Sequence, residues 1–304
     1  SYVESQFEFN LISPSVLDYS VIDGTEPAES MLTVNEYIAE DYWYAVNGSS
    51  LPENLQGVRS RADEISEKYG VRILLSSQCL PACTFAEYPT TTTDQMDLAD
   101  EAASINAALD SLEEALSLYP EGFFPQFRSE FGDGGIRIML VGGFESNFNM
   151  IGYSVQNSLW HNIYVDIFSE GLVGTYCHEI WHATEDHITS INYGEFDVVQ
   201  WAELNPDGFQ YIFDPAESIL NEGDYTYFGS TKPKDCYFID GYAKTNERED
   251  RARIMEYAMT GFFGSELSEY PHLYAKLRYM SDKIRQYFDT TGWNTPRWED
   301  ALGE

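Results

Sequence analysis

The sequence of 304 residues predicts an α+β fold, and the periodicity of its apolar residues carries that prediction. Apolar residues recur every three or four positions over 52–69 and 94–118, which indicates two amphipathic helices. Short apolar runs over 71–75, 135–141 and 162–168 are typical of buried strands. The chain therefore mixes helices and strands, and it is long enough to bury a sizeable core.

The C-terminal half follows a different pattern. Residues 188–240 are rich in turns and aromatic side chains and show no clear helix, and a loop region of this length usually serves a function. Helical spacing returns over 245–262, where Asn246 is a suitable N-cap, and over 271–287. The chain after residue 240 should therefore be mostly helical.

Turn residues and composition divide the chain into an arm and one main domain. Residues 1–50 contain several turn signals and no strong period, so we expect an N-terminal arm. Residues 51–304 should form the main domain, with an N-terminal lobe over 51–187 and a C-terminal lobe over 188–304.

The chain is strongly acidic, with 17 Lys and Arg against 51 Asp and Glu and a formal net charge of −34. Nucleic acid and anionic membrane surfaces would repel it, so neither is an expected partner. No apolar run reaches about 18 residues, so we expect no membrane-spanning segment. The charge suits a very soluble protein, or one that meets cationic substrates.

One stretch carries a metal-binding pattern, H-E-x-x-H, at His178, Glu179 and His182. Residues four apart lie on one face of a helix, so both imidazoles can bind one Zn²⁺ ion. Glu179 points toward the same side and is a candidate general base for an attacking water. Thr175 is a candidate N-cap for this helix.

This motif has only three fixed positions and can occur by chance on a helix without a metal. A catalytic zinc site usually takes a third protein ligand, which must come from elsewhere in the chain. His187 is a poor choice, because its position on the helix turns it away from the side shared by His178 and His182. An acidic residue on a later helix is the remaining option.

The stretch over 241–252 supplies that residue through a resemblance. With the H-E-x-x-H stretch, it resembles gluzincin-like zincin metallopeptidases, among them anthrax lethal factor and its relatives, and secreted bacterial zinc-binding metallopeptidases. In that family a Tyr is followed seven residues later by a zinc-binding Glu, and Tyr242 and Glu249 match this spacing. The last helix is also similar, so the resemblance covers roughly 162–287.

The resemblance implies a zincin-like α+β fold, with a mixed sheet and the active-site helix in the N-terminal lobe and a mostly helical C-terminal lobe. It also implies a zinc-dependent peptidase in which His178, His182 and Glu249 bind Zn²⁺. Glu179 would act as general base, and Tyr242 would stabilise the oxyanion. The substrate would be a peptide or a protein.

The same resemblance implies a secreted protein, extracellular or on the cell surface. We also expect a monomer. The chain begins at Ser1 rather than at a Met, so we expect a mature form. A removed N-terminal segment could have carried a lipid anchor.

One position departs from the family pattern. Four residues after Glu249, where a second carboxylate could orient a zinc-binding His, the chain has Arg253. The orienting carboxylate must then come from elsewhere, and Asp250 and Glu256 are the candidates.

Two alternatives to a peptidase keep the same fold: a non-catalytic surface-binding protein, and a zinc hydrolase of a non-peptide substrate. In the family, the strand before the metal helix borders the cleft and pairs with extended substrate, which would be Asn162 to Phe168 here. The acidic residues of 188–240 would favour peptides with Lys or Arg if they wall the cleft. If they face outward, aromatic residues such as Tyr211 and Phe213 would set an apolar preference instead.

Cys79 and Cys83 are close enough in sequence to form a small disulfide loop in a secreted protein. A zinc cluster of the four cysteine thiols is the alternative, but the C-x-x-C pairs that would support it are absent. Cys177 precedes the motif on its helix and is expected to be a small core residue.

Overall fold

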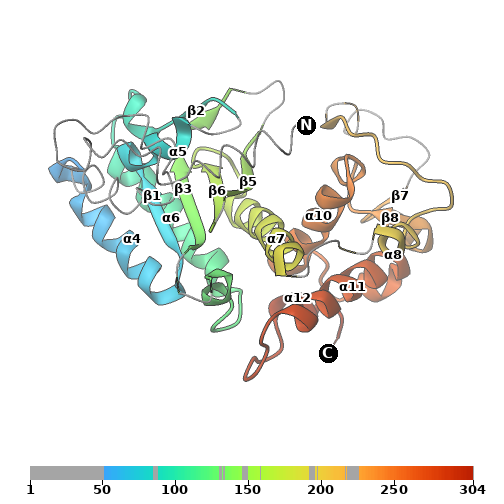
Figure 1. Cartoon of the computed structure of the whole chain (residues 1–304). Coiled ribbons are helices and arrows are strands. Elements are labelled where there is room, and N and C mark those ends of the chain that lie inside the picture. Colours follow the sequence, from blue (N-terminus) through green and yellow to red (C-terminus); the bar gives the residue numbers. More distant parts are fainter. Residues whose placement is uncertain are drawn as a thin grey trace, which may run out of the picture. The chain divides into compact units, whose positions relative to one another are not determined.

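The computed structural model describes residues 51–303 except 85–87, 130–131, 133, 146–149, 158, 192–195, 197, 216 and 218–225. Residues Asn54–Glu304 group into one unit, which combines a mixed sheet with several helices (Figure 1). This mixture of helices and strands agrees with the predicted α+β class. The predicted N-terminal arm, residues 1–50, lies outside the described residues.

A four-stranded sheet has the strand order β1, β3, β6, β5. β1 (Arg72–Leu75), β3 (Gly135–Val141) and β6 (Trp160–Asp166) run parallel, and β5 (Gly152–Asn157) pairs antiparallel with β6. The sheet is therefore mixed, with β1 and β5 at its edges. Two short pairs lie outside it: β2 (Thr90–Thr91) with β4 (Gly143–Phe144), and β7 (Thr226–Tyr227) with β8 (Cys236–Phe238).

The inner strands follow from their apolar sequence. Every residue of β3 is buried, as a continuous apolar run predicts for a strand covered on both faces. The strand predicted over 162–168 exists, but β6 begins at Trp160 and ends at Asp166. β5 has no counterpart among the predicted strands, because an edge strand buries few side chains: Tyr153 is buried whereas Gln156 is exposed.

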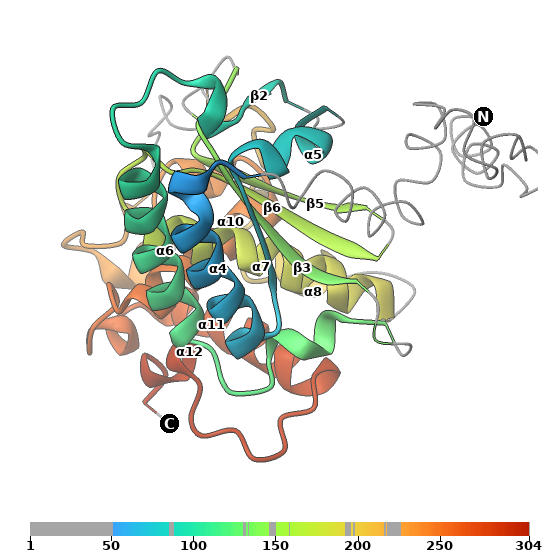
Figure 2. The same ribbon diagram turned by 90° about the vertical axis from the view of Figure 1, so that its left-hand side faces the viewer.

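Two amphipathic helices, α4 (Gln56–Tyr69) and α6 (Glu101–Ser117), pack against each other beside the sheet (Figure 2). α4 ends where Gly70 adopts a φ of 77°, a left-handed conformation that glycine tolerates without strain. α6 begins later than predicted, because the Asp100 side chain accepts a hydrogen bond from the Ala103 N–H and caps the helix there. Their buried faces repeat every three or four residues, as the periodicity predicts, and include Val58, Ala62, Ile65, Ile105, Leu109, Leu112 and Leu116.

Helix α7 (Leu172–Ile191) connects the sheet with the C-terminal helices (Figure 1). It packs on β5, β6 and α6, and also on α10 (Glu247–Thr260). α10 in turn contacts α11 (Pro271–Tyr287) and α12 (Arg297–Asp300). Shorter segments are helices α5 (Leu80–Thr84) and α8 (Val198–Ala202), and 3₁₀ turns at Glu53–Leu55, Ser76–Cys79, Thr93–Gln95, Phe124–Phe127, Pro233–Asp235, Tyr242–Lys244 and Leu267–Glu269.

The C-terminal helices match the predicted spacing closely. α11 has both predicted ends, and α10 begins directly after Asn246, the predicted N-cap. α8 is one short helix inside the region predicted to have none, so that prediction is wrong over 198–202. In the part of the chain that the structure describes, no helix combines the length and apolar character needed to cross a membrane.

The predicted disulfide between Cys79 and Cys83 is wrong, because both residues are free thiols. Cys79 ends a 3₁₀ turn and its thiol contacts the Leu140 carbonyl, whereas Cys83 lies one turn further on, in α5. Burial raises the pKa of both thiols, that of Cys83 to about 12, so they remain protonated at neutral pH. Cys177 is fully buried, as expected for a core residue.

Two histidines outside the motif lie in an aromatic cluster. His161 and His187 are buried, and their rings meet edge to face, with centroids 5.7 Å apart. Both rings also pack on Phe127, and His187 packs on Phe288. His187 is therefore a core residue, which agrees with its rejection as a third metal ligand.

This cluster should make the protein less stable in mild acid. Burial lowers the pKa of His161 to about 4, and burial together with the neighbouring His161 lowers that of His187 to about 4. The unfolded chain, with histidine pKa near 6.5, binds these protons first, so stability falls as pH drops from about 6.5 to about 4. Each imidazole contributes roughly 3 kcal/mol to this loss at most.

Denaturant unfolding of wild type and His187→Phe, measured from pH 8 to pH 4, checks this expectation. Phe keeps an aromatic ring in the cluster but cannot be protonated, so the variant should lose less stability in acid than wild type. Titration of carboxylates is common to both proteins and cancels in the comparison. If the free energy of unfolding falls by the same amount in both proteins between pH 8 and pH 4, His187 does not cause the loss of stability in acid.

Candidate metal site

Helix α7 carries the three residues of the H-E-x-x-H motif on one unbroken stretch. It begins at Leu172, so Thr175 lies inside the helix, where its N–H donates to the Gly171 carbonyl. The prediction that Thr175 caps the helix is therefore wrong. His178 and His182 lie one turn apart and are both buried except for a small exposed fraction.

Helix α10 brings Glu249 to the same place. The Asn246 side chain accepts hydrogen bonds from the N–H groups of Arg248 and Glu249, which fixes the start of α10. α10 packs closely on α7 at Gly174, where an added Cβ would come within 3.0 Å of the Glu256 carboxylate. This close approach sets the first turn of α10 beside the two histidines.

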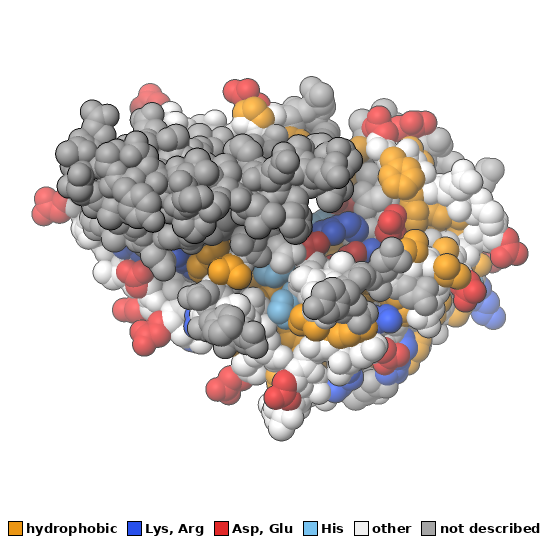
Figure 3. All heavy atoms as spheres, in the orientation of Figure 1, with side chains coloured by type: hydrophobic (Ala, Val, Ile, Leu, Met, Phe, Trp, Pro, Cys, Tyr) orange, Lys and Arg blue, Asp and Glu red, His pale blue; other side chains and the backbone are white. Residues whose placement is uncertain are grey.

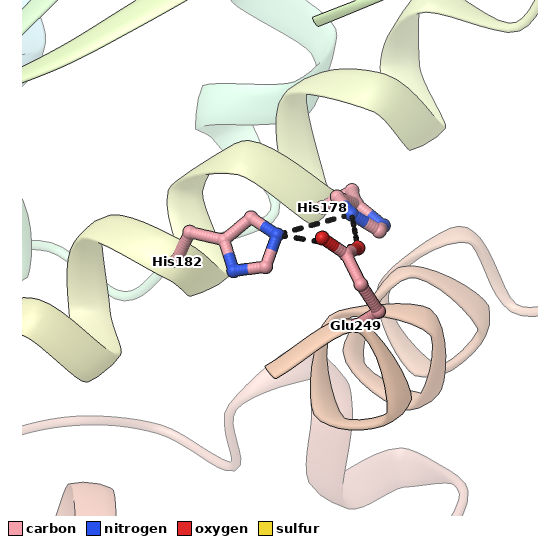
Figure 4. Close-up of side chains that lie close together, drawn as sticks. All are labelled: His178, His182 and Glu249. Atoms are coloured by element: carbon pink, nitrogen blue, oxygen red, sulfur yellow. Dashed lines mark hydrogen bonds and ion pairs between the residues drawn. The ribbon is translucent and has the colours of Figure 1, made fainter. Parts of the chain in front are cut away.

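His178, His182 and Glu249 converge with a spacing that fits one metal ion (Figure 4). The Nε2 atoms of the two histidines are 3.2 Å apart, and the Glu249 Oε2 atom lies 3.0 Å and 3.5 Å from them. Ligand atoms bound at about 2.0–2.1 Å to a tetrahedral Zn²⁺ lie roughly 3.3 Å from one another. Two imidazoles and one carboxylate also form a donor set that zinc prefers.

The electrostatics of this cluster favour a positive charge. Burial alone would lower the pKa of His178, but the hydrogen bonds that its imidazole donates to Glu249 and Glu256 outweigh it and raise that pKa to about 10. Burial likewise opposes ionisation of Glu249, yet its contacts with His182 and His178 hold its pKa well below the usual range. The same groups would stabilise a divalent cation at this point.

A carboxylate outside the ligand set orients His178. Glu256 Oε2 lies 3.3 Å from His178 Nδ1, and Arg253 forms an ion pair with the same carboxylate. Arg253 also donates to Asp240, so this arginine holds the Glu256 carboxylate in place. Of the two predicted candidates, Glu256 is the one that contacts the site. Asp250 is buried and instead pairs with Lys276, at 2.6 Å.

Replacing Glu256 by Gln should weaken zinc binding by about 10- to 100-fold, the usual effect of losing a carboxylate that orients a metal-binding histidine. The amide fills the same space but accepts the imidazole N–H less strongly. Competition titration with a zinc chelator measures the affinity, and Glu247→Gln, on the first turn of the same helix, is the matched control. Equal zinc affinity of wild type and Glu256→Gln would contradict this role.

Glu179 lies beside the three donor atoms with a carboxylate oxygen that is ready to accept a proton. Its side chain is buried, and in the described structure its Oε2 atom has no hydrogen-bond partner. Burial raises the pKa of this carboxyl group, while the two motif histidines lower it. Its Oε1 atom would be 3.0 Å from a Cβ at Gly152, so a glycine in β5 leaves room for Glu179.

Tyr242 lies on the other side of the site, in the 3₁₀ turn that precedes α10. Its ring and that of His178 have centroids 6.3 Å apart. Burial and the charges of Glu249 and Glu179 raise the pKa of its phenol, so the hydroxyl remains a hydrogen-bond donor at neutral pH. That hydroxyl also contacts Glu249, so it lies close to the point where a metal ion would hold a substrate.

The motif residues open into a cavity of about 270 Å³. It is lined from the sheet side by Gly152, Tyr153 and Ser154, and from the α10 side by Tyr242 and Glu249, among others. Imidazole side chains reach the surface near the middle of the face shown in Figure 3, next to hydrophobic side chains. His178 and His182 themselves are 9% and 7% exposed and line the cavity, so a ligand can reach them from outside.

The strand that borders this cavity is β5 and not the predicted one. β6 lies between β3 and β5, so both of its edges are paired, and the prediction that residues 162–168 border the cleft is wrong. β5 lies at the end of the strand order β1, β3, β6, β5, so its outer edge has no partner among the described strands of this sheet. A strand with Gly152, Ser154 and Gln156 has a weak apolar signal, so the sequence does not indicate its role.

Comparison with known proteins adds no relative. No protein-family model, no curated protein and no solved structure matches this chain.

Proposed function

We propose that the protein is a zinc-dependent peptidase with a zincin-like fold of the gluzincin type. The observation that carries this proposal is the convergence of His178, His182 and Glu249 at the ligand spacing of zinc. The Glu179 carboxylate, whose Oε2 atom has no hydrogen-bond partner among the described residues, lines the same cavity. The mixed sheet and the mostly helical C-terminal part are compatible with that fold.

The proposed reaction uses the residues in the following way. Zn²⁺, held by His178, His182 and Glu249, would act as a Lewis acid on the substrate carbonyl and make water more acidic. Glu179 takes a proton from the attacking water and passes it to the nitrogen of the leaving amine. Tyr242 donates its hydroxyl hydrogen to the carbonyl oxygen as negative charge develops there.

The edge strand supports a peptide as the substrate. β5 borders the cavity, and its outer edge is unpaired in the described sheet order, so an extended peptide could add to it as a further strand. Backbone hydrogen bonds of this kind would place a peptide carbonyl next to Glu179, which touches Gly152 of the same strand. A non-peptide substrate would have no use for this edge.

The two alternatives lead to different expectations. A non-catalytic binding protein would not need Glu179, yet this carboxylate is present, buried and free to accept a proton. A zinc hydrolase of a non-peptide substrate would share the metal ligands but would not cleave peptides.

Cleavage of a mixed peptide library, followed by mass spectrometry, separates the three functions. We expect the zinc-loaded protein to cleave a subset of peptides, a zinc chelator to stop cleavage, and added zinc to restore it. Cleavage of small esters or amides without any peptide cleavage would favour the non-peptide hydrolase. Zinc binding without turnover of either class would favour the binding protein.

A further inference from the structure

Phe213 is a large hydrophobic side chain that lies exposed on the wall of the candidate site. Phe213 is 72% exposed, and it lines the same cavity as His178 and Glu179. Ligand sites are lined mostly by hydrophobic and aromatic groups, with a few polar groups that fix orientation. An exposed aromatic ring next to the candidate metal ligands is therefore a candidate contact for substrate.

The backbone holds Phe213 in this position. Its φ of 59° lies in the left-handed region, which residues other than glycine rarely adopt. The N–H groups of Ile212 and Phe213 donate to the carbonyls of Lys244 and Thr245, at 3.0 Å and 2.8 Å. These bonds fix the segment to the turn that precedes α10. A strained conformation enforced by neighbouring contacts is typical of functional positions.

The sheet side of the cavity is apolar as well. Tyr88, Met150 and Tyr153 line it there. The Tyr153 ring stacks on that of Tyr164, with centroids 4.5 Å apart, and meets the edge of Tyr88 at 5.4 Å. A substrate side chain in the cavity would thus meet aromatic groups from the sheet and from the segment that holds Phe213.

Charged groups at the cavity do not form a comparable site for a cationic side chain. Among the described residues that line it, the acidic ones are Glu179 and Glu249, which the proposed reaction uses. Arg248 also lines it and pairs with Asp186, at 2.6 Å.

The region 188–240 contributes hydrophobic residues to the cavity, since its described lining residues are Phe213 and Pro215. The described acidic residues of that region are not among the residues that line the cavity; they are Glu203, Asp207, Asp214, Glu217, Asp235 and Asp240. Its remaining acidic residues, Glu195, Asp197, Glu222 and Asp224, lie outside the described residues. The described lining residues thus favour the apolar alternative over the electrostatic one.

We propose that Phe213 forms an apolar subsite beside the metal centre, and that the substrate is a peptide with a large apolar side chain next to the cleaved bond. This inference rests on the proposed peptidase function, but it concerns binding and can be tested without turnover. Phe213 acts here as a residue that determines specificity and takes no part in the chemistry.

The test measures peptide binding to the full chain carrying Glu179→Gln and loaded with zinc. The probes are four dye-labelled peptides that are identical except for one central residue, which is Leu, Ser, Lys or Asp. Fluorescence anisotropy gives the dissociation constants for this protein and for three further variants in the same background. These are Phe213→Asn, which tolerates the left-handed backbone, Phe213→Leu, which stays apolar, and Phe262→Asn, a control at another exposed phenylalanine.

The Leu peptide should bind about 10- to 100-fold more tightly than the Ser, Lys and Asp peptides, the usual range for filling an apolar pocket. Phe213→Asn should remove most of this preference, Phe213→Leu should keep most of it, and Phe262→Asn should leave it unchanged. Equal binding of the four peptides, no binding of any, or a Leu preference that survives Phe213→Asn would each overturn the proposal. If the zinc-loaded wild type cleaves none of these peptides, the peptidase function fails while the binding preference is still decided.

Discussion

Replacing Glu179 by Gln should lower kcat for peptide cleavage by about 10²- to 10⁴-fold, the usual contribution of a general base. The amide fills the same space beside Gly152 but cannot take a proton from water. Because Glu179 is not one of the three proposed ligands, the variant should still bind zinc. The measurement is the initial rate of cleavage of one peptide identified in the library.

Zinc content and the free energy of unfolding of Glu179→Gln serve as controls for this experiment. Both should stay close to the wild-type values, since a buried carboxyl whose Oε2 atom has no partner contributes little to the fold. Full activity in this variant, with contaminating protease excluded, would remove Glu179 from the role of base.

Replacing Tyr242 by Phe should lower kcat by about 10²- to 10³-fold, with a much smaller change in KM. The hydroxyl is expected to bind the carbonyl oxygen more strongly in the transition state than in the ground state, so its loss acts on kcat. The ring, which lies beside His178, stays in place in the variant.

Tyr237→Phe is the matched control, because Tyr237 lies in β8, stacks on His272 of α11 and does not line the cavity. Its kcat should equal that of wild type. A Tyr242→Phe enzyme with unchanged kcat would contradict the oxyanion role and leave Tyr242 as a packing residue. A loss of zinc in the variant would point to its contact with Glu249 instead.

The sequence predicts best the features that depend on local spacing. His178 and His182 share a face because helical geometry fixes residues four apart, and the structure places their Nε2 atoms 3.2 Å from each other. The cap at Asn246 and both ends of α11 follow from equally local rules. The apolar run of β3 predicts a buried strand for the same reason.

The features that depend on tertiary contacts were harder to predict. Spacing alone could not choose a third ligand: Glu249 came from a resemblance, and only the packing of α10 on α7 brings it to the histidines. Packing also selects Glu256 over Asp250, since the two side chains leave α10 in different directions.

Edge strands and short loops explain the remaining errors. β5 carries a weak apolar signal, so the cavity border was assigned to β6, which the sheet order places between two partners. Cys79 and Cys83 are neighbours in sequence, but both are free thiols, Cys79 at the end of a 3₁₀ turn and Cys83 in α5. Secretion, a lipid anchor and the monomeric state stay predictions.

Zinc content is the most direct test of the central claim, that His178, His182 and Glu249 bind one Zn²⁺ ion. The full chain should be purified, loaded with excess zinc, dialysed, and measured by elemental analysis beside His182→Ala. We predict about one zinc per chain in wild type and far less in the variant, since zinc sites of this kind need all three protein ligands. Far less than one zinc per chain in wild type, or equal zinc in both proteins, would contradict the account.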